Sequence, residues 1–220
     1  EKSQSLSLSA DMYHSWGAWQ GNLLVEGFFT DLSDVFALTE IGIEDGILVK
    51  ERRNESGARV GGFNLEGKIA YEDHWQLQAG LTWHRSLYKE AHSWADDVEA
   101  TRKMFRTPDL YGYFVTSCSP VKPLTLSLSG TYTGRMLVEH HSGYIEQNRT
   151  EKTPGFFDLN FKIAYDFKLY RHINLQLNAG VQNFLNAWQK DFDQGPDRDS
   201  GYIYGPAAPR CFFAGIKLGW

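Results

Sequence analysis

Hydrophobic and polar residues alternate along most of this chain with a period of two residues. The segment INLQLNAGVQ (173–182) shows this most clearly, because apolar side chains occupy its odd positions and Asn, Gln or Gly its even ones. The segments 75–83, 124–134 and 157–167 alternate in the same way. A period of two predicts β-strands with one apolar and one polar face.

The alternation predicts nine strands, which span residues 4–14, 20–38, 57–72, 75–90, 107–119, 124–138, 154–168, 173–187 and 208–220. The connections between them alternate in length. The short ones are 15–19, 72–74, 120–123 and 169–172, and the long ones are roughly 39–56, 91–106, 139–153 and 188–207. The sequence therefore predicts an all-β chain built from consecutive antiparallel hairpins.

Two architectures have strands of this kind, a soluble β-sandwich that binds a partner and a transmembrane β-barrel. Expected strands of about 11 to 19 residues are long for a sandwich, where 5 or 6 are usual. Aromatic residues stand at both ends of apolar stripes, as Trp75 and Trp83 do, and the polar faces carry charges such as Glu66 and Lys68. Short turns on one side and long loops on the other complete the pattern of a transmembrane antiparallel β-barrel.

The charge and the residue patterns of the chain argue against several other classes of function. The net charge of −5 gives no electrostatic basis for nucleic-acid binding. No arrangement of Ser, His and Asp or of paired carboxylates predicts an enzyme. Cys118 and Cys211 are expected at opposite ends of their strands, so we predict two free thiols.

The direction of the strands predicts that this chain is part of a larger barrel. If the short turns are periplasmic, the last strand runs inward to Trp220 and the first of nine strands begins on the outer side, near Glu1. Single-chain bacterial barrels have an even number of strands, and a bilayer does not tolerate unpaired sheet edges. We therefore expect residues 1–220 to be the C-terminal portion of a barrel whose other strands lie elsewhere.

Two motifs near the C-terminus resemble those of TonB-dependent outer-membrane receptors. The first ends the penultimate strand and comprises Val181, Asn183, Phe184, Leu185 and Asn186. The second opens the last strand and comprises Gly205, Pro206, Pro209, Arg210, Phe213 and Gly215. The segments RTPDLYGYF (106–114) and SGTYTGRMLVEHHSGY (129–144) are similar to those of cobalamin-receptor-like members from Bacteroidetes.

The resemblance implies an integral protein of the bacterial outer membrane. In this family the barrel has 22 strands, so the chain would supply about nine at the C-terminal end. The implied partners are the N-terminal part with its plug domain, the TonB–ExbB–ExbD complex, outer-membrane lipids and, in similar systems, a surface lipoprotein. The implied C-terminal assembly signal comprises Phe212, Ile216, Leu218 and Trp220.

The implied activity is energy-coupled import of a scarce nutrient, namely cobalamin, haem or another metal chelate. Two alternatives share the strand pattern. One is a passive porin or structural barrel, and the other is a TonB-dependent importer of glycans or peptides. The sequence assigns no cofactor to the chain.

The long loops contain the candidate ligand residues. His140, His141 and Tyr144 follow one strand, and His92, Trp94 and Arg135 lie near it; imidazole nitrogens and aromatic rings suit a metal chelate or haem. A second candidate is a Ca²⁺ site in an acidic loop, formed by Asp191, Asp193, Asp197 and Asp199. The alternative for both sets is an ordinary solvated loop.

Overall fold

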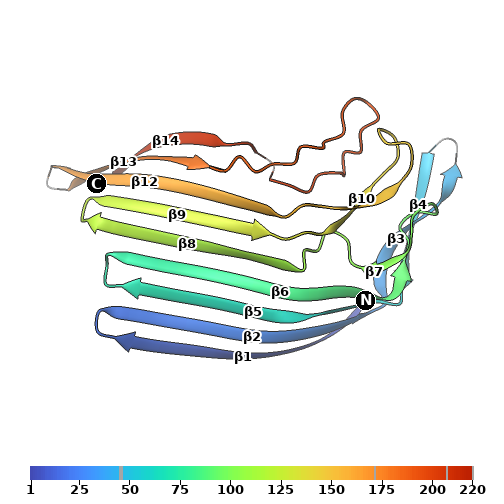
Figure 1. Cartoon of the computed structure of the whole chain (residues 1–220), viewed down its shortest axis with the longest axis horizontal. Coiled ribbons are helices and arrows are strands. Elements are labelled where there is room, and N and C mark those ends of the chain that lie inside the picture. The colour runs from blue at the N-terminus through green and yellow to red at the C-terminus, as the bar shows by residue number, and fades with distance from the viewer. Residues whose placement is uncertain (45–46, 171, 207, 220) are drawn as a thin grey trace.

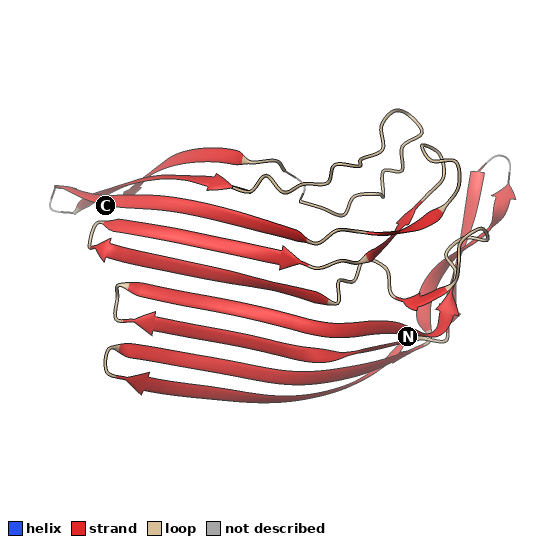
Figure 2. Cartoon of the chain, in the orientation of Figure 1, coloured by secondary structure: helices blue, strands red, loops and turns tan. Residues whose placement is uncertain are grey.

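The computed structural model describes every residue except 45–46, 171, 207 and 220, and it consists of a long curved sheet of antiparallel strands (Figures 1 and 2). Nine strands follow one another across this sheet in the order β1-β2-β5-β6-β8-β9-β12-β13-β14. They are β1 (Lys2–Trp16), β2 (Trp19–Ser33), β5 (Ala58–Tyr71), β6 (Trp75–His92), β8 (Leu110–Val121), β9 (Leu124–Thr133), β12 (Phe156–Tyr170), β13 (Ile173–Gln182) and β14 (Cys211–Gly219). Nine consecutive strands joined as hairpins confirm the expected arrangement.

The two ends of the sheet differ in the way the sequence predicts. Short turns join the strands at one end, and the long connections gather at the other (Figure 1). The N-terminus lies at the long-loop end and the C-terminal strand ends at the short-turn end (Figure 1). We call these the outer end and the inner end of the sheet.

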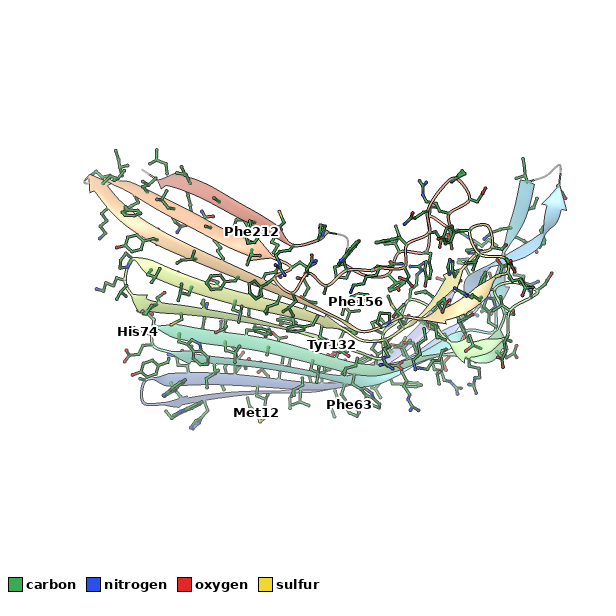
Figure 3. The ribbon with its side chains drawn as sticks, turned by 45° about the horizontal axis from the view of Figure 1, so that its top comes forward. Met12, Phe63, His74, Tyr132, Phe156 and Phe212 are labelled. Carbon is green, nitrogen blue, oxygen red and sulfur yellow. The ribbon has the colours of Figure 1, made fainter. Side chains whose placement is uncertain are left out.

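The register of the strands separates an apolar face from a polar one across the whole sheet. Leu177 lies opposite Tyr165 on β12 and Ile216 on β14, whereas the next residue, Asn178, lies opposite Ala164 and Gly215. Leu177 is 42% exposed and Ile216 75% exposed, so these apolar side chains have no protein above them. Figure 3 shows Met12 and Phe63, which belong to the same face, projecting from the lower side of the sheet. A sheet that exposes a continuous apolar face and keeps polar residues on the other fits a barrel wall in lipid.

Strand ends depart from the alternation at several places. The predicted strand 20–38 stops at Ser33, because Asp34 adopts a positive φ of 56°. The predicted loop 39–56 is instead mostly a separate hairpin of β3 (Val35–Glu44) and β4 (Ile47–Glu55). Short pairings also form within the other long connections, namely β7 (Thr101–Lys103), β10 (Leu137–His140) and β11 (Arg149–Lys152).

The predicted strands 124–138 and 173–187 are also too long, since they end at Thr133 and Gln182. Asn183 stops β13 by adopting a φ of 49° and by bonding the chain that follows. Its side-chain oxygen accepts from the N–H of Ala187 at 2.8 Å, and its side-chain nitrogen donates to the carbonyls of Ala187 at 2.8 Å and Ala208 at 2.9 Å. An Asn side chain that satisfies the backbone in this way favours a turn over a strand.

The cysteine prediction is confirmed, since both cysteines are free. Cys118 pairs with Trp75 near the inner end, and Cys211 begins β14 toward the outer end. Within the described residues, no helix is long and apolar enough to cross a membrane.

Side chains on the polar face bond one another between strands. Glu66 accepts hydrogen bonds from Gln78 at 2.6 Å and from the Tyr113 hydroxyl at 3.1 Å. The Tyr113 ring reaches Glu66 by lying across Gly80, where an added Cβ would be only 2.6 Å from a ring carbon. The absence of a side chain at Gly80 is thus required for this contact.

Gly80→Ala should therefore displace the Tyr113 ring and lower stability by about 1–3 kcal/mol, the usual cost of overpacking. Gly67→Ala is the matched control, because a Cβ there would meet its nearest side-chain atom at 3.9 Å. The urea midpoint of the complete protein in lipid vesicles measures both changes. Equal midpoints for the two variants would contradict the requirement for Gly80.

Candidate functional site

The long connections at the outer end fold against one another into a single unit, which we call the outer loop cluster. It comprises the described residues of the ranges 93–107, 135–153 and 183–210. Arg106 joins all three segments, because its backbone N–H donates to the carbonyl of Leu137 at 2.7 Å and its guanidinium donates to the carbonyls of Ile203, at 3.0 Å, and Gly201. Segments far apart in the sequence therefore hold one another in place.

A buried histidine–carboxylate pair lies inside the outer loop cluster. His140 Nε2 lies 3.0 Å and 3.1 Å from the two carboxylate oxygens of Asp193, and the two side chains are 3% and 2% exposed. The His140 ring stacks on Tyr202 with a centroid distance of 3.6 Å. Its Nδ1 is buried and has no hydrogen-bond partner among the described residues. Because a carboxylate only accepts, Nε2 donates, and the pair joins β10 to the last loop.

Asp199 extends the same connection. Its backbone N–H donates to Asp193 at 2.9 Å, and its carboxylate accepts from the backbone N–H groups of His141 at 2.9 Å and Gly201 at 2.7 Å. Gln189 lies 1% exposed on the other side of the loop, where it donates to the carbonyl of Tyr202 and accepts from the N–H of Tyr204, both at 3.0 Å. The loop is therefore held by side chains that satisfy its backbone groups, as buried loops require.

Asp191 accepts hydrogen bonds from two tyrosine hydroxyls. The Tyr202 hydroxyl donates at 2.9 Å and the Tyr204 hydroxyl at 2.5 Å. Burial, and then the hydrogen bond to the Asp191 carboxylate, raise the pKa of both tyrosines well above its usual value. Burial alone would raise the pKa of Asp191, but the hydrogen bonds from Tyr204 and Tyr202 outweigh it and hold that pKa below its ordinary value of 3.8.

These pKa shifts set a pH window for the loop. The lowered pKa of Asp191 contributes stability that is present above about pH 4 and is lost as the pH falls through the folded-state value. The raised pKa of the two tyrosines contributes stability that is present below about pH 10 and is lost at higher pH. Proteolysis of the 183–210 loop in the complete protein should therefore be slowest between these limits. Tyr204→Phe should flatten both edges of the profile, and an unchanged profile in that variant would contradict the assignment.

The predicted ligand residues fall into two groups. His140 and Trp94 are 3% and 5% exposed, and the indole N–H of Trp94 donates to the Thr150 hydroxyl at 3.1 Å. His141 is partly exposed and packs edge-on against Trp94, with ring centroids 4.7 Å apart. The remaining candidates lie nearer the surface: Tyr144 is 54% exposed, Arg135 is exposed, and His92 is partly exposed with its ring 5.5 Å from that of Tyr88.

The acidic loop uses most of its carboxylates internally. Asp191, Asp193 and Asp199 accept the hydrogen bonds described above, whereas Asp197 is exposed. Across the described residues, no three His, Cys, Asp or Glu side chains form a group that could hold a metal ion. A Ca²⁺ site at these four aspartates stays a prediction.

The two C-terminal motifs contact each other in the structure. Asn186 of the first motif accepts from the backbone N–H of Arg210 in the second at 2.9 Å, and the Arg210 guanidinium lies 5.8 Å from the centre of the Phe184 ring. The motif residues thus fix the two ends of the last long loop beside each other.

The profile of one protein family matches most of the chain. It is described as "TonB dependent receptor-like, beta-barrel" and covers residues 1–184. The chain belongs to this family. The proteins of this family are transporters and not enzymes, and their barrels are integral to the bacterial outer membrane. No curated protein sequence matches it.

Solved structures of TonB-dependent receptors share the fold of this receptor barrel. The ferric-catecholate import receptor Fiu of Escherichia coli is 18% identical, with a TM-score of 0.62 over 97% of this chain and 27% of Fiu. A variant of the ferric enterobactin receptor PfeA of Pseudomonas aeruginosa is 15% identical, with a TM-score of 0.61 over 99% of this chain and 31% of PfeA. The copper transporter OprC is 14% identical, with a TM-score of 0.58 over 97% of this chain and 30% of OprC. The chain spans about a third or less of the length of these receptors.

Three of the four residues of the expected assembly signal lie on the apolar face of the receptor barrel. Phe212 and Ile216 are each 75% exposed and Leu218 is 54% exposed. Trp220 lies outside the described residues. The assembly role of this set stays a prediction.

Proposed function

We propose that this chain is the C-terminal part of the barrel of a TonB-dependent transporter that imports a metal chelate. The observation that carries the proposal is a polar barrel wall whose outer end is covered by one interlocked unit of loops. The structural relatives named above bind or import ferric catecholates, ferric enterobactin or copper, which supports a chelate of this chemistry. Cobalamin and haem are the other metal chelates that fit the sequence.

The proposed partners follow from the same assignment. The plug domain would lie against the polar face, where carboxylates, amides and hydroxyls are displayed to the lumen. The TonB–ExbB–ExbD complex would supply energy from the periplasmic side, and a surface lipoprotein would lie over the outer loop cluster. The remaining strands of the barrel would pair with the free edges of β1 and β14.

Ligand contact is proposed for the exposed candidates, Tyr144 and Arg135. A phenol and a guanidinium can hydrogen-bond an anionic chelate without moving the loops. His140 and Trp94 would act by holding the loops in position, because their side chains are buried.

Uptake and binding by the complete receptor test the proposal. Isothermal titration calorimetry with a ferric catecholate, haem, cyanocobalamin and a copper(II) chelate should show saturable binding of one of these. Tyr144→Ala should weaken that binding, and uptake in cells should disappear when TonB is deleted. Uptake that is unaffected by TonB deletion, together with a steady open pore in planar bilayers, would instead support a passive porin.

A further inference from the structure

The apolar face of the sheet has a measurable height. On β5 and β6 it begins at Tyr71 and Trp75 near the inner end and continues through Leu65 and other apolar residues. It closes with Phe63 and Trp83, which lie opposite each other, stack with ring centroids 6.2 Å apart and are 59% and 45% exposed. Eight residues of a strand rise about 26 Å, which matches an apolar band of about 25 Å in a membrane barrel.

Directly beyond this band, β5 and β6 carry cationic residues on the same face, beside Phe29 of β2. Register places Arg85 opposite Gly61 and Arg59 opposite Asp31, all on the face that carries Phe63 and Trp83. Asp31 accepts from Arg59 Nε at 2.9 Å and from Lys89 Nζ at 2.5 Å. Arg59 and Lys89 therefore share one carboxylate while Arg85 stands beside them without one, which leaves a local charge of about +2 in a chain whose net charge is −5. We call Arg59, Arg85 and Lys89 the rim cations.

Two of the rim cations are available to a ligand. The Arg85 side chain is exposed and makes no ion pair or hydrogen bond within the described part of the chain, and Arg59 keeps 61% of its side chain exposed. Arg85 lies two residues beyond Trp83, or about 7 Å, which places it at the level of the lipid headgroups. Its Cα is about 7 Å from that of Arg59, within the reach of two guanidinium groups to one phosphate.

We infer that the rim cations and the Phe63–Trp83 pair form a binding site for a phosphorylated lipid of the outer leaflet. The phosphate would bind between the guanidinium groups of Arg85 and Arg59, which favour bidentate contacts with phosphate oxygens. The acyl chains would continue down the apolar face over the two stacked rings. Basic groups next to a membrane surface attract anionic headgroups, and the position of these residues above an aromatic belt fits that geometry.

The test uses the complete receptor purified in detergent and titrated with diphosphorylated lipid A, with native mass spectrometry as the readout. Arg85→Gln should weaken binding about fivefold, the usual effect of one basic residue at a membrane surface, and Arg85→Glu by about 20-fold. Because the side chain of Arg85 bonds no other described residue and its backbone pairing does not depend on residue type, neither substitution should disturb folding. Lys217→Glu is the control of equal charge change, on the polar face near the inner end, and should leave the affinity unchanged.

Three results would overturn the inference. The first is an affinity that Arg85→Glu does not change. The second is an equal loss in Lys217→Glu, which would indicate a response to net charge alone. The third is displacement of the lipid by inorganic phosphate at equal concentration, which would mean that the site recognises phosphate without its lipid. Lipid A without phosphates should bind the original protein and Arg85→Glu equally weakly.

Discussion

Leu177→Arg should lower the free energy of unfolding of the complete receptor by about 2–4 kcal/mol, whereas Asn178→Arg should change it little. The two residues are neighbours near the middle of β13 and point to opposite faces of the sheet. Leu177 would place a guanidinium against lipid chains, where no water can solvate it. Asn178 lies between Ala164 and Gly215 on the polar face, so an arginine there has both space and water.

Urea titration of the receptor in lipid vesicles, followed by tryptophan fluorescence, measures this difference. The fraction of each variant that reaches the outer membrane in cells provides a second readout. If both variants lose stability equally, the assignment of the two faces is wrong. A larger loss for Asn178→Arg would mean that the polar face, and not the apolar one, is closed to water.

Asp193→Ala should open the outer loop cluster at a cost of about 3 kcal/mol. It would leave the imidazole of His140 buried without a partner on either nitrogen, and the N–H of Asp199 would also lose its acceptor. Removing one member of a buried pair costs about 3–5 kcal/mol, and local opening of the loop limits the loss. Because the barrel strands do not depend on this pair, the effect should be confined to the loops.

Hydrogen exchange of residues 183–210 measures the opening. Exchange there should accelerate by about two orders of magnitude, while strands β12 and β13 keep their protection. Asp197→Ala removes the same charge from an exposed position in the same loop and should leave exchange unchanged. Similar acceleration in both variants would show that charge, and not the buried pair, controls the loop.

The alternation of residue types is sufficient to predict the sheet, because one face of each strand contacts lipid and the other faces a polar lumen. Successive residues are therefore apolar where they face lipid and polar where they face the lumen, as in 173–182. The alternation does not predict the hairpin β3–β4, which lies outside the main sheet. Its two faces do not meet lipid on one side and a polar lumen on the other, so its residue types need not alternate. The early ends of β9 and β13 depend on loop contacts that a period of two does not encode.

The outer loop cluster was predictable only in part. The sequence marks His140, Trp94 and Asp193 as chemically notable, but their burial depends on contacts between residues 53 to 56 positions apart. No local sequence pattern predicts the roles of Gln189, Tyr202 and Tyr204. The two tyrosines do share a loop with several aspartates, which is the one feature that points to Asp191 as the acceptor of their hydrogen bonds. The spacing of residues along the sequence does not predict long-range contacts between loops of this kind.

Labelling of introduced cysteines in intact cells tests the central claim most directly, namely that the sheet spans the outer membrane with its long loops outside. In the complete receptor with Cys118 and Cys211 replaced by Ser, Tyr144→Cys lies in the outer loop cluster and Asp73→Cys in a short turn, and both positions are exposed. A maleimide that does not cross the outer membrane should label Tyr144→Cys in intact cells and label Asp73→Cys only after the cells are lysed. Labelling of Asp73→Cys in intact cells, with Tyr144→Cys protected until lysis, would contradict the account.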